Sequence, residues 1–79
     1  MAKVVVKLIY PERLIKEPII GRMTKKFEVM PNIRRARVTE DYGEVTLEIE
    51  GESEEVERAL SWLREVGVIV EPVPGSVIE

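Results

Sequence analysis

The side chains with the most distinctive chemistry in this sequence stand together in residues 31–43, PNIRRARVTEDYG. Asn32 is the only asparagine in a chain that has no glutamine and no histidine, and Arg34, Arg35 and Arg37 follow it closely. An amide beside three guanidinium groups could hold a small ligand, bind an anionic partner such as RNA, or only contact the neighbouring strand. Which of these applies depends on the elements that position the segment.

The residue types that the chain lacks exclude several kinds of catalytic site. It has no cysteine, so disulfides, thiolate metal sites and iron–sulfur clusters cannot form, and without histidine there is no imidazole base or ligand. The serines have no partner that could take a proton, and the glutamates of residues 54–57 are expected on a solvated helix face. We therefore predict that the protein is not an enzyme and has no metal and no cofactor.

Charge and hydropathy argue against nucleic acid and against membrane insertion. The net charge is -3, whereas nucleic-acid binders are usually basic, and the expected central strands present Val, Lys, Glu and Thr rather than the aromatic residues that stack on RNA bases. The N-terminal run MAKVVVKLIYPERL is interrupted by Lys7 and is too short for a signal sequence or a membrane span. We predict a cytoplasmic protein that binds no nucleic acid.

The period of the hydrophobic pattern changes several times and predicts four strands and two helices. Residues 3–10 read as a strand, 11–17 as a loop, 18–29 as a helix that Pro31 ends, 33–40 and 44–50 as two strands, 54–66 as a helix with Ser53 as N-cap and Gly67 at C′, 68–73 as a strand and 74–79 as a tail. This βαββαβ order predicts one α+β domain over residues 1–79. We expect a ferredoxin-like plait with two helices on one face of a four-stranded antiparallel sheet, in strand order 4-1-3-2.

The facing of the arginines follows from the alternation along the expected hairpin. With Ala36 and Val38 toward the core, Arg35 and Arg37 face out, and a turn at residues 42–43 would place Arg37 opposite Glu48 and Arg35 opposite Glu50. In that register Thr39 lies opposite Thr46, Val38 opposite Leu47 and Ala36 opposite Ile49. Cross-strand glutamates would then neutralise the arginines, which favours a structural role over anion binding or a partner contact.

Two other features of the sheet remain open to a functional interpretation. Asn32 follows a helix-to-strand connection, where it could bond to the local backbone or present its amide to a ligand. On the face that the helices leave uncovered, Val5 and Ile9, with either Ile69 or the pair Val68 and Val70, would form an apolar stripe. Such a stripe predicts self-association, although single exposed valines are common in strands.

The sequence resembles the NIL domain, named for an Asn-Ile-Leu motif, from its first strand to about residue 73. The resemblance is carried by PII at 18–20, NI at 32–33, Ala36, Val38, the strand that Gly43 leads, and ALSWLREVGV at 59–68. Arg34 stands where the motif has leucine, and this NIRRA form resembles the branch of the family that is attached to small ferredoxin modules or stands alone.

The resemblance implies an ACT-like ligand-sensing module. NIL domains occur at the C-terminus of ATPase subunits of methionine-import ABC transporters, where they pair and bind methionine to inhibit transport. Carried over to this chain, Asn32 and Ile33 become ligand-side candidates, and Arg34 beside them leaves the identity of the ligand open. The ferredoxin-linked branch is associated with sulfur and homocysteine metabolism.

Together these observations predict a dimeric, non-catalytic regulatory module that binds an amino acid or a sulfur metabolite such as methionine. The alternative is an interaction module that docks onto a ferredoxin, a transporter ATPase or a sulfur-transfer or homocysteine-pathway enzyme and binds no metabolite.

Overall fold

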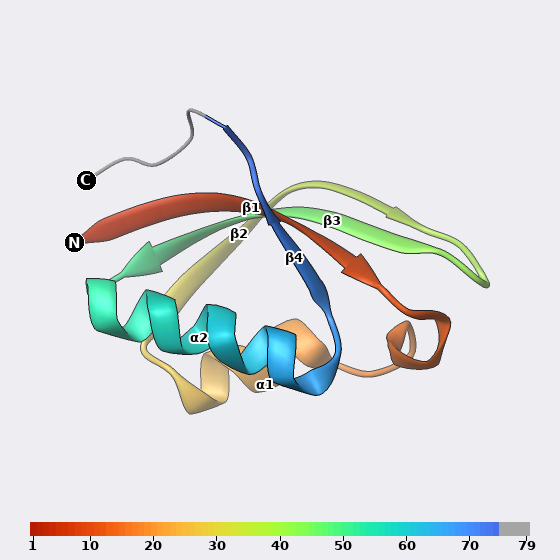
Figure 1. Ribbon diagram of the computed structural model, residues 1–79, viewed down its shortest axis with the longest axis horizontal. Helices are drawn as coiled ribbons and strands as arrows, with labels where there is room; N and C mark the ends of the chain where they lie inside the picture. The colour runs from red at the N-terminus through yellow and green to blue at the C-terminus, as the bar shows by residue number, and fades with distance from the viewer. Residues whose placement is uncertain (75–79) are drawn as a thin grey trace.

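The computed structural model describes residues 1–74, which form an antiparallel sheet with both helices on one of its faces (Figure 1). In chain order the elements are β1 (Ala2–Tyr10), the 3₁₀ turn η1 (Glu12–Leu14), α1 (Ile19–Lys26), β2 (Val29–Val38), β3 (Gly43–Gly51), α2 (Ser53–Val66) and β4 (Ile69–Pro72). The sheet has the order β2-β3-β1-β4, which is the predicted order 4-1-3-2 read from its other edge. The predicted ferredoxin-like fold is therefore confirmed; the predicted tail lies, from residue 75 on, outside the described residues.

Alternation on the two central strands decides which face the helices cover. On β3 the buried side chains are Val45, Leu47 and Ile49, and on β1 they are Val6 and Leu8, so one face of each strand is apolar. Among residues 1–74 the edge strands contribute no fully buried side chain, and the core is built by Val6, Leu8, Leu14, Ile19, Met23, Val45, Leu47, Ile49, Val56, Ala59, Leu63 and Val68. The opposite face of the sheet, which we call the open face, is left uncovered by the helices (Figure 1).

Helix α1 is shorter than the sequence predicts, and β2 begins correspondingly earlier. Phe27 has the helical spacing from Met23, and its amide still donates to the Met23 carbonyl, but its own backbone is extended. The chain then enters β2 at Val29, so Pro31 lies inside this strand rather than ending the helix. A proline is tolerated there because β2 is an edge strand, where a missing N–H need not break a ladder.

Helix α2 ends as predicted but begins differently. Ser53 is its first residue and not its N-cap; Glu52 occupies that position without a side-chain hydrogen bond, and the Val56 amide donates to the Glu52 carbonyl. At the other end Gly67 has φ 110°, and the amides of Gly67 and Val68 donate to the carbonyls of Arg64 and Leu63. These two bonds form a Schellman motif, for which glycine is the favoured residue.

The predicted hairpin register is wrong by four residues. Arg37 lies opposite Glu44, Ala36 opposite Val45 and Val38 opposite Gly43, because the Thr39 amide bonds to the Tyr42 carbonyl and the chain turns at residues 40–41. Gly43 is the first residue of β3, and a Cβ there would lie 3.2 Å from the Cβ of Tyr10 on β1. The predicted facing of the side chains still holds, since a shift by an even number of residues leaves each side chain on its face.

Candidate functional site

The three residues predicted to lie near a ligand are not brought together on one face. Asn32 lies opposite Glu48 and therefore points to the open face, whereas Ile33 lies opposite Leu47 on the side of the helices. Ile33 is nonetheless 55% exposed, and it lies on the edge strand β2, which has a neighbouring strand on one side only. Arg34 occupies the irregular step between Ile33 and Arg35, where β2 has one residue more than β3.

The bulge gives Arg34 a partner that the sequence does not reveal. Its guanidinium lies 2.7 Å from one oxygen of Glu48, and Lys3 on β1 lies 3.2 Å from the other. The hydrogen bond from Lys3, and after it the bond from Arg34, hold the pKa of the Glu48 carboxyl below its ordinary value against the opposing effect of desolvation. Arg34 is thus held by the sheet itself, while Asn32 beside it is exposed.

A second cluster of charges lies nearer the hairpin turn. The Tyr42 hydroxyl donates to Glu44, and the ammonium of Lys7 lies 3.3 Å from the other carboxylate oxygen. The bond from Tyr42 is the main reason that the pKa of Glu44 is lowered, and the same bond raises the pKa of Tyr42. The ladder places Arg37 opposite Glu44, so the open face alternates between cationic and anionic strands.

The apolar residues predicted on the open face do lie there. Ile9 and Ile69 are cross-strand neighbours, and Val5 is paired with Glu48. Of the two possibilities on the last strand the structure has Ile69, which is 52% exposed, because Val68 is buried and Val70 packs against the core.

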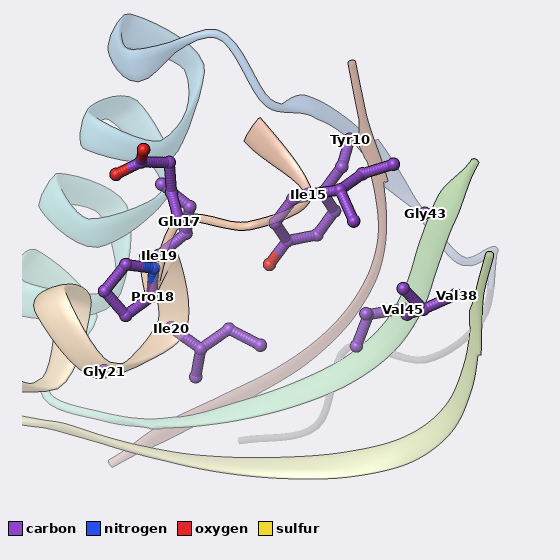
Figure 2. A pocket seen from close by; sticks show the side chains of 10 residues that line it. All are labelled: Tyr10, Ile15, Glu17, Pro18, Ile19, Ile20, Gly21, Val38, Gly43 and Val45. Atoms are coloured by element: carbon purple, nitrogen blue, oxygen red, sulfur yellow. The ribbon is translucent and has the colours of Figure 1, made fainter. Parts of the chain in front are cut away.

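A cavity that the sequence did not predict lies where β1 ends and α1 begins (Figure 2). Its volume is about 230 Å³, and aliphatic side chains dominate its wall, with Tyr10, Ile15, Ile20, Val38 and Val45 facing the space and Glu17 at its edge. Helix α1 has eight residues and spans about 12 Å, whereas the ten residues of β2 extend over about 33 Å. Since α1 cannot cover the whole strand, the end of β2 and its Val38 stay open.

Sequence reasoning missed this cavity because its lining residues come from separate segments, which are the connection after β1, the start of α1, the end of β2 and the start of β3. Val38, which the sequence predicts to lie toward the core, remains 59% exposed at the edge of this cavity. The cavity and the predicted ligand residues are separate, because the five steps along β3 from Glu48, opposite Asn32, to Gly43, opposite Val38, correspond to about 17 Å.

Comparison with known sequences identifies the family. The sequence model of the NIL domain matches residues 4–72, which is nearly the whole chain. The chain belongs to the NIL domain family. The resemblance seen in the sequence is thereby confirmed, and the match includes the candidate residues Asn32, Ile33 and Arg34.

Curated relatives of this NIL domain are much longer proteins. Over 59 residues, or 70% of this chain, it is 46% identical to "Methionine import ATP-binding protein MetN 1" of Bacillus cereus. The identity to the protein of the same name from Bacillus anthracis is 42%. The aligned segment spans only 17% of the length of each of these relatives.

A solved structure has the same fold. The C-terminal domain of an ABC transporter / ATP-binding protein from Enterococcus faecalis superposes with a TM-score of 0.79, covering 92% of this chain and 86% of that one, at 21% identity. Among residues 1–74 of the present chain no helix is both long and apolar enough to cross a membrane.

Proposed function

We propose that this protein is a single, non-catalytic NIL-type domain, with a core of residues 3–73, that acts as a cytoplasmic regulatory module by binding a small amino acid or sulfur metabolite. The observation that carries the proposal is the 46% identity to a methionine import ATP-binding protein. Methionine is accordingly the first ligand to test. The side-chain amide of the exposed Asn32, which has no hydrogen bond within residues 1–74, can both donate to and accept from the polar end of such a ligand.

Calorimetric titration with methionine, homocysteine and cysteine tests this function. We expect saturable binding of at least one of the three, weakened about tenfold or more in Asn32→Ala, because the variant loses the amide that fixes the ligand. Arg35→Ala is the matched control, since Arg35 is also exposed on β2 and points to the open face. If Asn32→Ala bound the ligand with the same heat and affinity as the unmodified protein, the assigned site would be contradicted.

A second candidate function is supported by the apolar residues of the open face. Val5, Ile9 and Ile69 lie on the surface that the helices leave free, where they could contact a second copy or another protein. In this case the domain docks onto a transporter ATPase, a ferredoxin or a sulfur-transfer enzyme and binds no metabolite. This second function predicts that calorimetry detects no heat of binding with any of the three ligands. It also predicts that the domain binds a purified partner of one of these kinds, and that Ile69→Lys weakens this binding.

A further inference from the structure

The cavity beside α1 is built by segments that are far apart in the sequence. Ile15 comes from the connection after β1, Ile20 from the first turn of α1, Val38 from the end of β2 and Val45 from β3. Figure 2 shows these side chains turned toward a common space. Ligand pockets are typically concave and mainly apolar with a few polar groups, and this space has that character.

One polar side-chain group points into the apolar space. The Tyr10 ring enters the cavity with its hydroxyl foremost (Figure 2), and within residues 1–74 this hydroxyl makes no hydrogen bond. Burial raises the pKa of Tyr10, so the hydroxyl stays a neutral donor at physiological pH. A half-buried hydroxyl without a partner in an aliphatic cavity is available to a ligand.

Two backbone donors stand at the rim of the same space. In the first turn of α1 the amide of Ile19 bonds to the Glu17 carbonyl and that of Arg22 to the Pro18 carbonyl, whereas for Ile20 and Gly21 no acceptor lies within residues 1–74. Ile20 and Gly21 both line the cavity. Free first-turn amides favour a negatively charged group or a hydrogen-bond acceptor.

The only charged side chain along the wall is already neutralised within the described residues. Glu17 turns away from the cavity (Figure 2), and its carboxylate lies 2.8 Å from the guanidinium of Arg22. It therefore neither repels an anion strongly nor offers a free carboxylate to a cation. The groups left for a ligand are an apolar wall and three hydrogen-bond donors.

We propose that this cavity is a second ligand site, which takes a small aliphatic carboxylate with its hydrocarbon chain between Ile20, Val38 and Val45. The carboxylate accepts hydrogen bonds from the Tyr10 hydroxyl and the first-turn amides of α1. A volume of about 230 Å³ is below the ~300 Å³ at which pockets for drug-sized molecules begin, so the ligand has the size of a single amino acid or a short-chain acid. The site is independent of the proposed function at Asn32.

Methyl-detected NMR of the full chain, titrated with 4-methylpentanoate, tests the site. The methyl signals of Ile20, Val38 and Val45 should shift along one saturable curve, with a dissociation constant on the order of 1 mM because so small a ligand buries few atoms. A parallel titration with L-leucine, which has the same hydrocarbon skeleton and an added ammonium group, distinguishes a simple acid from an amino acid as the ligand.

Two variants and a matched control locate the binding. Val38→Trp fills the cavity from an exposed position and should weaken binding about tenfold, and Tyr10→Phe, which removes only the hydroxyl, about fivefold. Ile33→Trp places the same bulk on the same face of β2 outside the cavity, so binding should not change. Equal affinity in all variants, or scattered shifts without saturation, would overturn the proposal.

Three further outcomes separate this site from a contact between copies and from the site at Asn32. If the cavity methyls shift on dilution of the protein alone, a second copy occupies the space and the proposal fails. If methionine binds through Asn32 while neither 4-methylpentanoate nor leucine binds the cavity, the proposed function stands and the second site is refuted. Binding of 4-methylpentanoate that Asn32→Ala leaves intact, with no response to the three metabolites, supports the second site and refutes the proposed function.

Discussion

Glu48 is the carboxylate around which the charges at the centre of the open face are arranged. Strands on both sides supply its partners, Lys3 from β1 and Arg34 from β2, and its side chain is only 13% exposed. A pair of this kind at a surface contributes little by itself, but two cations that share one carboxylate fix the positions of three strands relative to one another. The primary role of the charged residues in this cluster is therefore to stabilise the sheet, and any contact with a ligand is secondary.

The lowered pKa of Glu48 predicts the pH range in which the cluster stabilises the fold. Because the folded-state pKa lies below the ordinary value of 4.5, the stabilisation is fully present above pH 4.5 and is lost as the pH falls through the folded-state pKa. Glu48→Gln should have a lower thermal midpoint than the unmodified protein near pH 7, and the difference should shrink near pH 3. Circular dichroism melts at both pH values measure this.

Glu50→Gln is the control for this experiment, because Glu50 lies on the same strand and face but forms no ion pair within residues 1–74. Its midpoint should follow that of the unmodified protein at both pH values. If the deficit of Glu48→Gln were as large near pH 3 as near pH 7, its cause would be packing and not charge.

The glycines of the two helices have different structural roles. Gly67 ends α2 with φ 110°, and a Cβ there would also lie 2.5 Å from a guanidinium nitrogen of Arg13. Gly21, inside α1, has open space around it and no such backbone requirement. The first glycine is needed by the backbone, whereas the second only weakens its helix.

Alanine substitutions at the two glycines should therefore change stability in opposite directions. Gly67→Ala should lower the free energy of unfolding by about 1–2 kcal/mol, because alanine is strained at positive φ, and the flexible Arg13 side chain can move aside at little cost. Gly21→Ala should raise it by about 0.5–1 kcal/mol, since alanine has the higher helix propensity. Urea denaturation measures both, and a loss of stability in Gly21→Ala would show that α1 is more crowded than the structure indicates.

The elements were predictable where periodicity is long and undisturbed, and not where the chain changes direction. The βαββαβ order of elements predicted the fold and the strand order correctly. The predicted end of the first helix was wrong because of Phe27 and Pro31. A helical spacing and a proline cannot distinguish a helix of twelve residues from one of eight residues that is followed by an edge strand. The predicted cross-strand partners in the hairpin were wrong because every shift of the register by an even number of residues satisfies the same pattern of apolar and polar residues.

The candidate sites could likewise be predicted only in part from the sequence. The sequence identified Asn32 and Arg34 as distinct from the other polar residues, but only the bulge explains why Arg34, and neither Arg35 nor Arg37, reaches Glu48. The cavity lies between the start of α1 and the end of a hairpin whose register was predicted wrongly. Its lining residues share no motif, and therefore no local pattern could have gathered them.

At the scale of the whole molecule, the open face differs in net charge from the rest of the chain. Among residues 1–74 the open face has five cations and four anions, which are Lys3, Lys7, Arg34, Arg35, Arg37, Glu44, Glu48, Glu50 and Glu71, so these residues have a net charge of +1 while that of the whole chain is -3. The rest of the protein accordingly has a net charge of -4. Net charge therefore opposes contact between two open faces only weakly.

This distribution and the apolar group of Val5, Ile9 and Ile69 predict that dimers form through the open face. Sedimentation equilibrium at high concentration should give a mass near twice 9.1 kDa. Ile69→Lys should raise the dissociation constant about tenfold or more, because it places a charge in the apolar part of the contact. Ile33→Lys is the matched control, since Ile33 is as exposed as Ile69 but lies on the other face of the sheet. A monomer at every concentration would refute the dimer, and a dimer that only Ile33→Lys disrupts would place the contact at β2 and not at the open face.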